Sequence, residues 1–225
     1  MVSLSNHAGL AAFACVGTTI ERRARKTRKG SLFFAGLAVF AFFVVTAARA
    51  QPRPTATATF AGGCFWSMEH VFDEIAGVRS VTVGYTGGTA QKPSYEQVEL
   101  GITGHVEAVR VVFDPAQVDY DVLLTAYWHS TDPTDGTGQF CDVGAQYRPV
   151  IFYTGDAQRQ QAEASKQALE DSHRFKRIAT RIAPALPFWI AEAYHQHYYK
   201  THASAYERYR IGCGRDARLK KLWSR

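Results

Sequence analysis

The 225-residue sequence has no excess of charge outside its first 50 residues. Those 50 residues hold seven Lys and Arg and one Asp or Glu, which accounts for the whole formal net charge of +6 and leaves 19 residues of each sign in the remaining 175. A folded part without net charge has no electrostatic footprint for phosphate groups, so we expect no nucleic-acid partner.

Glycine and proline are too irregularly placed for collagen, and the chain contains no internal repeat. At 46% hydrophobic and 13% aromatic residues, the composition is also unlike that of disordered proteins. We expect a single compact domain at residues 57–225, preceded by a short Pro-containing linker at residues 51–56.

The longest uncharged apolar run lies before this domain. It extends from Leu32 to Ala47, follows the basic cluster at residues 21–29 and precedes Ala-Arg-Ala at residues 48–50. This order is typical of a secretory signal peptide cleaved after Ala50, and an uncleaved membrane anchor is the alternative. We therefore expect an exported protein, periplasmic or secreted, that touches the membrane only through this leader if it is uncleaved.

Cysteine is scarce: Cys15 lies in the leader, and Cys64, Cys141 and Cys213 lie in the domain. Three cysteines cannot all pair within one chain, so at least one thiol must be free in an oxidising compartment. This odd count indicates a reactive thiol, and a merely buried cysteine is the alternative.

Hydrophobic periodicity predicts alternating strands and helices without a strict βαβ repeat. Residues 131–146 have the composition of a polar loop, and the chain from Ala191 onward is aromatic without clear periodicity. We expect an α+β fold: a two-layer sandwich with a mixed β-sheet, a ferredoxin-like core and an irregular C-terminal tail. Strands are predicted at residues 57–60, 78–85, 95–100, 105–113, 150–153 and 178–185, and helices from 65 to about 77, at 119–130 and at 156–172.

Cys64 lies in the segment AGGCFW, which joins the first predicted strand to the first predicted helix. At the start of a helix, unpaired amides and the positive end of the helix dipole stabilise a thiolate. We therefore predict that the pKa of Cys64 falls below its usual value of about 8.5 and that the thiol is a nucleophile.

Six blocks of the sequence occur in an order that matches a known family. The blocks are GCFW at 63–66, GYTGG at 84–88, PSYEQV at 93–98, TGHVEAVRVVFDP at 103–115, DVGAQYRPVIF at 142–152 and AEAYHQHY at 191–198. They cover roughly residues 57–212 and resemble the A-type peptide methionine sulfoxide reductases. The resemblance implies a monomeric, cofactor-free enzyme that uses a thiol to reduce methionine-S-sulfoxide, free or in proteins. It also implies that the enzyme repairs oxidised proteins and that a thioredoxin-like reductant recycles it.

Reduction of a sulfoxide needs a thiolate to attack sulfur, an acid to protonate oxygen and an apolar slot for the methyl group. Cys64 is the candidate nucleophile. Glu107 is the candidate acid, because strand alternation places it on one face with Val109 and Val111, where burial would raise its pKa and keep it protonated. The candidates for the slot are Phe65 and Trp66.

The remaining roles rest on the resemblance. It implies that Tyr95 and Tyr147 hydrogen-bond the sulfoxide oxygen and that Asp142 lies near the substrate amide. The attack converts the catalytic thiol to a sulfenic acid, and a second thiol must then condense with it to form a disulfide. We expect Cys213, in a glycine-flanked mobile tail, to be this resolving thiol in a one-disulfide cycle, with Cys141 as the alternative.

Two other functions could use some of the same residues. A secreted Cys-His hydrolase would use His105 or His195 as the base for Cys64, but it leaves Glu107 and Cys213 without a role. A binding module held by one disulfide would need no reactive thiol. The His195-Gln196-His197 segment lacks the usual spacing of zinc ligands, so we expect hydrogen-bonding roles for these histidines and no metal.

Overall fold

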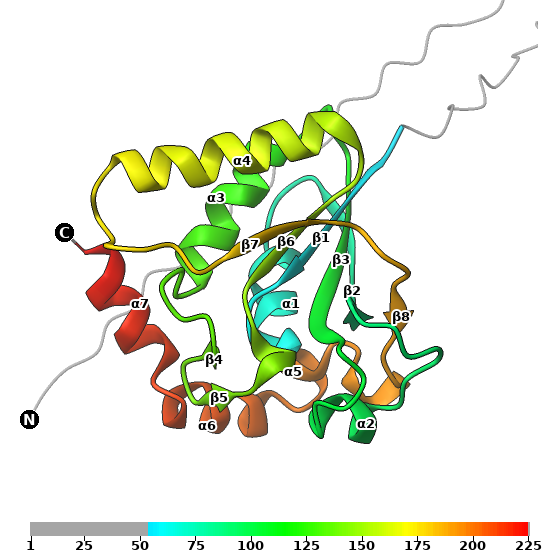
Figure 1. The fold of residues 1–225 in the computed structure, drawn as a ribbon. Helices are drawn as coiled ribbons and strands as arrows, with labels where there is room; N and C mark the ends of the chain where they lie inside the picture. The colour runs from blue at the N-terminus through cyan, green and yellow to red at the C-terminus, as the bar shows by residue number, and fades with distance from the viewer. Residues whose placement is uncertain (1–53, 225) are drawn as a thin grey trace, which may run out of the picture. The chain divides into compact units, whose positions relative to one another are not determined.

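The computed structural model describes residues 54–224, so the predicted signal peptide lies outside the described residues, as does the first half of the linker. A sheet of six strands runs through the domain (Figure 1). Its order is β7-β6-β1-β3-β2-β8. The strands are β1 (Ala56–Ala61), β2 (Val78–Thr86), β3 (Val106–Phe113), β6 (Val150–Tyr153), β7 (Arg181–Pro184) and β8 (Trp189–Ile190).

Four of these strands and two helices form a βαββαβ unit. Helix α1 (Phe65–Asp73) connects β1 to β2, and α3 (Tyr120–Ser130) follows β3 on the way to β6. The order β6-β1-β3-β2 with antiparallel neighbours is the ferredoxin-like arrangement. Strand β7 extends the sheet by pairing parallel with β6, and α4 (Gly155–Asp171) connects the two. The expected α+β fold with a mixed sheet and a ferredoxin-like core is confirmed.

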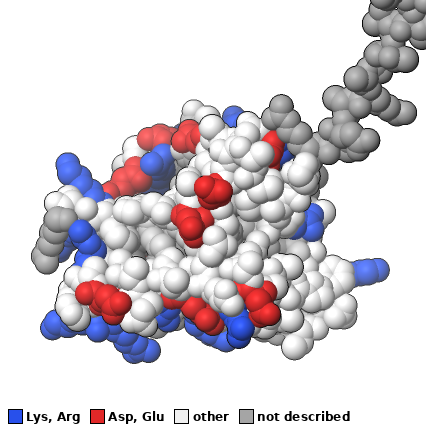
Figure 2. Space-filling model, turned by 90° about the horizontal axis from the view of Figure 1, so that it is seen from above, with Lys and Arg blue, Asp and Glu red and all other residues white. Residues whose placement is uncertain are grey.

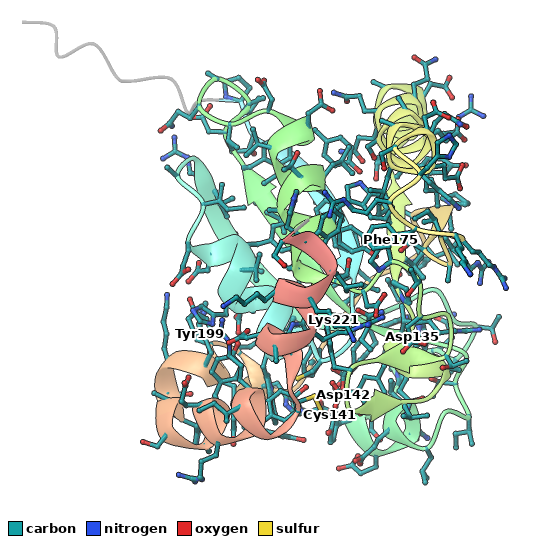
Figure 3. The ribbon with its side chains drawn as sticks, turned by 90° about the vertical axis from the view of Figure 1, so that its left-hand side faces the viewer. Asp135, Cys141, Asp142, Phe175, Tyr199 and Lys221 are labelled. Atoms are coloured by element: carbon teal, nitrogen blue, oxygen red, sulfur yellow. A yellow bond between two sulfur atoms is a disulfide. The ribbon has the colours of Figure 1, made fainter. Side chains whose placement is uncertain are left out.

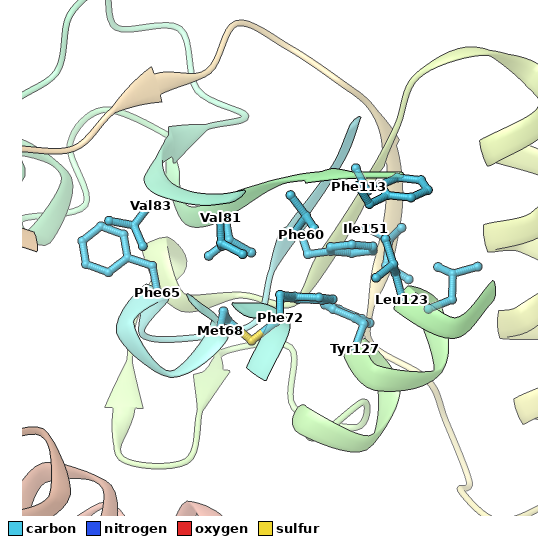
Figure 4. Close-up of a cluster of buried hydrophobic side chains, with 14 of the residues drawn as sticks. Phe60, Phe65, Met68, Phe72, Val81, Val83, Phe113, Leu123, Tyr127 and Ile151 are labelled. Atoms are coloured by element: carbon cyan, nitrogen blue, oxygen red, sulfur yellow. The ribbon is translucent and has the colours of Figure 1, made fainter. Parts of the chain in front are cut away.

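The main core lies where β1 packs against α1 and α3 (Figure 4). The ring of Phe60 stacks on Phe72 of α1 at a centroid distance of 4.8 Å and on Tyr127 of α3 at 5.4 Å. The Tyr127 hydroxyl also donates a hydrogen bond of 3.0 Å to the carbonyl oxygen of Ala61. This contact fixes the end of β1 directly before the turn that carries Cys64.

Residues 95–99 form a helix, so the strand predicted at residues 95–100 is wrong. Helix α2 (Tyr95–Glu99) begins after Ser94, whose hydroxyl accepts a hydrogen bond from the Gln97 amide, while the Gln97 side chain accepts one from the Ser94 amide. This reciprocal capping box satisfies two amides that a helix start leaves unpaired. The local cap therefore decides the structure of a segment too short for periodicity to classify.

The predicted polar loop at residues 131–146 contains a small hairpin. Strands β4 (Gly138–Gln139) and β5 (Asp142–Val143) pair antiparallel and are followed by a 3-10 turn at Ala145–Tyr147. The buried Gln139 side chain accepts a hydrogen bond from the Asp132 amide and donates one to the Asp132 carbonyl. These bonds fix the hairpin, whose two-residue loop contains Cys141.

The C-terminal part of the chain is helical, so the expectation of an irregular tail is wrong. After a 3-10 turn at Ala193–His195 come α5 (Tyr198–Thr201), α6 (Ala203–Gly212) and α7 (Arg215–Trp223). The first two attach to α1 largely through polar and aromatic contacts, such as the hydrogen bond between His70 and Tyr206 and that from Tyr199 to Asp73. Contacts of this kind leave no apolar period in the sequence, so the sequence does not predict these two helices.

On the face of the domain that Figure 2 shows, acidic and basic side chains both occur, in keeping with the charge balance of the sequence. No helix within residues 54–224 combines the length and the apolar character that crossing a membrane requires.

Candidate active site

Cys64 is the N-cap residue of α1, and its carbonyl accepts hydrogen bonds from the amides of Ser67 and Met68. The preceding Gly63 has φ of +83°, and a Cβ atom there would lie 2.6 Å from the Gln139 side chain. Only glycine allows this backbone conformation together with so close an approach. The turn thus places Cys64, which is 6% exposed and is the free cysteine of the described residues, at one end of the core.

Cys64 opens onto a pocket of about 110 Å³ that the structure forms from widely separated segments. All seven nucleophile, acid and substrate-binding residues expected from the sequence line this pocket: Cys64, Phe65, Trp66, Tyr95, Glu107, Asp142 and Tyr147. The eighth lining residue, Tyr209 of α6, was not predicted, because nothing in the sequence marks it once its helix goes unrecognised.

Glu107 is buried against the first residue of α1. Its Oε2 accepts a hydrogen bond of 2.9 Å from the Phe65 amide. Burial raises the pKa of Glu107 to about 8, with a smaller contribution in the same direction from Asp142, while the Phe65 amide opposes the shift. The carboxyl group therefore holds its proton at neutral pH, which agrees with the direction expected from its place on the strand.

The pKa of Cys64 is raised, so the prediction that it falls below its usual value is wrong. Burial is the largest cause, followed by the negative charges of Glu107 and Asp142, whereas the Tyr209 hydroxyl and the Trp66 amide oppose the shift. The helix start does favour a thiolate as expected, but removal of the thiolate from water has the larger effect. A thiolate at this position consequently depends on groups that compensate for burial.

Three phenols surround the same space. The Tyr209 hydroxyl donates a hydrogen bond of 2.5 Å to Oδ2 of Asp142, and its oxygen lies within hydrogen-bonding reach of the Cys64 sulfur. The pKa values of Tyr95 and Tyr147 are raised, first by burial and then by Glu107. These hydroxyls therefore keep their protons at neutral pH and can donate hydrogen bonds to an oxygen in the pocket.

Phe65 and Trp66 contribute apolar surface to the pocket, and the second ring is fixed by its neighbours. Trp66 stacks on Tyr198 at a centroid distance of 3.9 Å, and its Nε1 donates to Nδ1 of His195 at 3.2 Å. Neither His195 nor His105 lines the pocket, and both ring nitrogens of His105 bond backbone groups, the Gly88 amide and the Ala90 carbonyl. The arrangement gives Cys64 no histidine base of the kind a Cys-His hydrolase uses.

Cys141 and Cys213, the two candidates for the resolving thiol, are bonded to each other (Figure 3). The sequence alone did not predict this pairing. Cys213 caps α6 directly before α7, so it lies between two helices instead of in a mobile tail. Since Tyr209 lies one helical turn before Cys213, and Asp142 follows Cys141, the disulfide lies beside the Cys64 pocket.

The disulfide is accessible from outside the domain. While the two sulfurs are bonded to each other, they are not available as metal ligands. A hollow of about 560 Å³ reaches Cys213, and Cys141 is exposed. Ligand atoms of Cys141, Asp142 and Cys213 lie within 4.8 Å of one another, a spacing that could suit a cation. Because the two sulfurs bond each other, the group has no thiolate to offer a metal.

Residues 56–225 match a family described as "Peptide methionine sulfoxide reductase". The chain is 49% identical over 192 residues to peptide methionine sulfoxide reductase MsrA 2 of Caulobacter vibrioides, a match that covers 85% of this chain and 96% of that protein. It is 52% identical over 167 residues to the Listeria innocua MsrA, covering 74% and 94%. Among solved structures, methionine sulfoxide reductase A of Corynebacterium diphtheriae superposes with a TM-score of 0.62 and 35% identity, covering 69% of this chain and 78% of the other.

These similarities extend over nearly the whole described domain and support neither a hydrolase nor a binding module. They agree with a pocket that combines a free thiol, a protonated carboxyl group and three phenols. The chain belongs to the peptide methionine sulfoxide reductase family and is a thiol-dependent reductase of methionine sulfoxide.

Proposed function

We propose that Cys64 is the nucleophile, Glu107 the proton donor, and Phe65 with Trp66 the slot for the methyl group of methionine-S-sulfoxide. The observation that carries this proposal is the buried hydrogen bond from the Phe65 amide to Glu107. Because Phe65 directly follows Cys64, this bond holds a protonated acid next to the thiol. Tyr95 and Tyr147 donate hydrogen bonds to the sulfoxide oxygen, and Asp142 lies where the substrate backbone enters.

In the first step the Cys64 sulfur attacks the sulfoxide sulfur, and the oxygen, protonated from Glu107, passes to Cys64. The products are methionine and a Cys64 sulfenic acid, so sulfur of the substrate is reduced and sulfur of the enzyme oxidised by two electrons. The Cys213 thiol then displaces the hydroxyl group, which leaves as water, and a Cys64–Cys213 disulfide forms.

Cys141 completes the cycle in this proposal, so two disulfides form in succession instead of the single one expected from the sequence. Its thiolate attacks Cys213, which forms the Cys141–Cys213 disulfide and releases Cys64 as a thiol. The pairing of Cys141 with Cys213 beside a free Cys64 supports this order, because it is the state that the exchange produces. A thioredoxin-like dithiol then reduces the accessible disulfide and is itself oxidised.

Glu107→Gln is expected to lower the rate of the first step on the order of 10²-fold, because the amide cannot deliver a proton. The ratio of the unaltered protein's rate to that of the variant should fall as pH rises through about 8, where Glu107 loses its proton, because the ionisation of Cys64 affects both proteins alike. Single-turnover release of methionine between pH 6 and 10 measures both effects. An unchanged rate at neutral pH would remove Glu107 as the donor.

We further propose that the protein acts outside the cytoplasm as a monomer, on methionine sulfoxide in exported proteins. Support comes from the sequence of residues 1–50, whose basic cluster, apolar run and Ala-Arg-Ala end are typical of a cleaved signal.

The expected product in the native host is an extracytoplasmic protein that begins at or near Gln51. N-terminal sequencing of the protein from fractionated cells tests this expectation. Full-length protein found in the cytosol would contradict the proposal, and full-length protein in the membrane fraction would indicate an anchor.

A further inference from the structure

Arg215, the first residue of α7, is a buried cation in an unfavourable position. Its side chain is 4% exposed, and burial lowers its pKa, although a guanidinium stays protonated in proteins. A cation at the start of a helix also opposes the helix dipole. Burial and the helix dipole both disfavour a positive charge at this position, so a negative charge nearby is needed to compensate.

No carboxylate within residues 54–224 forms an ion pair with Arg215. Its Nη2 donates to the Ser130 carbonyl at 2.7 Å, to the Gly62 carbonyl at 3.2 Å and to Sδ of Met68 at 3.4 Å. Its Cζ lies 4.5 Å from the centre of the Phe140 ring. These contacts are all with neutral groups, so they hold the side chain in place without neutralising it.

The other terminal nitrogen, Nη1, is buried and has no hydrogen-bond partner in the described chain. A Cβ atom built on Gly63 would lie 3.7 Å from this nitrogen, so the unpaired group lies against the glycine that directly precedes Cys64. The guanidinium thus lies behind the Gly62-Gly63-Cys64 turn. No Lys or Arg is among the residues that line the pocket in front of this turn.

We propose that Arg215 is a positioning residue whose charge stabilises the Cys64 thiolate through the backbone of this turn. The proposal rests on Cys64 being the nucleophile, and it accounts for how a buried thiol next to two carboxyl groups ionises. It also means that the segment supplying the resolving Cys213 supplies the activating charge, because only Gly214 separates the two residues. The other titratable groups that face Cys64 come from five elements: Tyr95, Glu107, Asp142, Tyr147 and Tyr209.

The test measures the ionisation of Cys64 without any sulfoxide. The protein, with Cys141 and Cys213 oxidised, is alkylated with iodoacetamide between pH 5 and 11, and the labelled Cys64 peptide is quantified by mass spectrometry, which separates it from other cysteines. Arg215→Gln removes the charge but keeps an amide donor for the carbonyls of Gly62 and Ser130. We expect the midpoint of alkylation to rise by at least about one pH unit, which makes labelling about 10-fold slower at a pH below both midpoints.

Two further variants separate charge from structure. Arg215→Lys keeps the charge with fewer donors and should retain a midpoint close to that of the unaltered protein. Lys220→Gln, an exposed position on the same helix, makes the same change in net charge and should leave the midpoint unchanged. Circular dichroism and thermal unfolding check that each variant is folded.

The proposal is overturned if a folded Arg215→Gln keeps the midpoint of the unaltered protein. It is also overturned if Arg215→Lys raises the midpoint by about one pH unit or more above that of the unaltered protein, because the side chain would then act only by packing; this result decides the matter if the glutamine variant does not fold. A failure of either kind, with Cys64→Ser still inactive, leaves the nucleophile assignment intact. Activity retained by Cys64→Ser would instead contradict the proposed function itself.

Discussion

Cys64→Ser is expected to lose sulfoxide reduction to below detection, a fall on the order of 10³-fold or more, because a hydroxyl group is a far weaker nucleophile than a thiolate. The substitution should leave the fold intact. Cys64 is the N-cap residue of α1, and serine is among the residues preferred at that position. Dithiothreitol-supported release of methionine measures the loss, and thermal unfolding measures the effect on stability.

The double variant Cys141→Ser/Cys213→Ser is the matched control for this experiment. It removes two sulfurs near the pocket, whereas Cys64→Ser removes one, yet dithiothreitol can reduce the Cys64 sulfenic acid directly, so turnover should continue. If the folded Cys64→Ser protein keeps most of its activity while the double variant loses it, the nucleophile has been assigned to the wrong residue.

Single substitutions at the other two cysteines should divide the cycle into its steps. Starting from fully reduced protein and one equivalent of sulfoxide, each form should release one methionine, because chemistry at Cys64 comes first. Cys213→Ser should then hold a sulfenic acid on Cys64, and Cys141→Ser should hold a Cys64–Cys213 disulfide. The unaltered protein should hold the Cys141–Cys213 disulfide that the structure contains.

Turnover with thioredoxin should fall about 10²-fold in Cys213→Ser and should also fall in Cys141→Ser, whose remaining disulfide involves the buried Cys64. Dithiothreitol should restore both in part. Mass spectrometry of the disulfide-linked peptides distinguishes the species. A Cys141→Ser variant that cycles with thioredoxin at the full rate would make the Cys141–Cys213 bond a structural one, and a Cys64–Cys141 bond in Cys213→Ser would give the first resolving step to Cys141.

The sequence predicted the parts of the fold in which apolar residues recur with a clear period. Strand β3 was expected because His105 to Phe113 alternates, and its alternation also placed Glu107 on the buried face with Val109. The pocket was expected because the residues that line it lie within ordered sequence blocks. On β3 one physical signal, burial of one face, dominates every other. Tyr95, Asp142 and Tyr147 were instead expected in the pocket because their sequence blocks resemble those of a known family.

The errors occur where two effects oppose each other or where contacts are distant. Helix amides lower the pKa of Cys64 and burial raises it, and the effect of burial, which depends on the folded surroundings, is the larger of the two. The role of Tyr209 depends on α6, whose attachment to the domain through polar and aromatic groups gives no apolar period. The pairing of Cys141 with Cys213 joins residues 72 positions apart, and a count of cysteines does not choose among the pairs.

The hydrogen bond between Trp66 and His195 joins residues 129 positions apart, and Tyr209 reaches a pocket that begins at Cys64. Closing loops of this length carries an entropic cost that is recovered only when the intervening sheet has formed. The pocket is therefore assembled after most of the domain has folded, and a partly folded chain holds Cys64 without the phenols of the pocket and without the bond that fixes the Trp66 ring. Reductase activity thus reports completion of the whole fold, whereas the helices and hairpins detected by spectroscopy can form earlier.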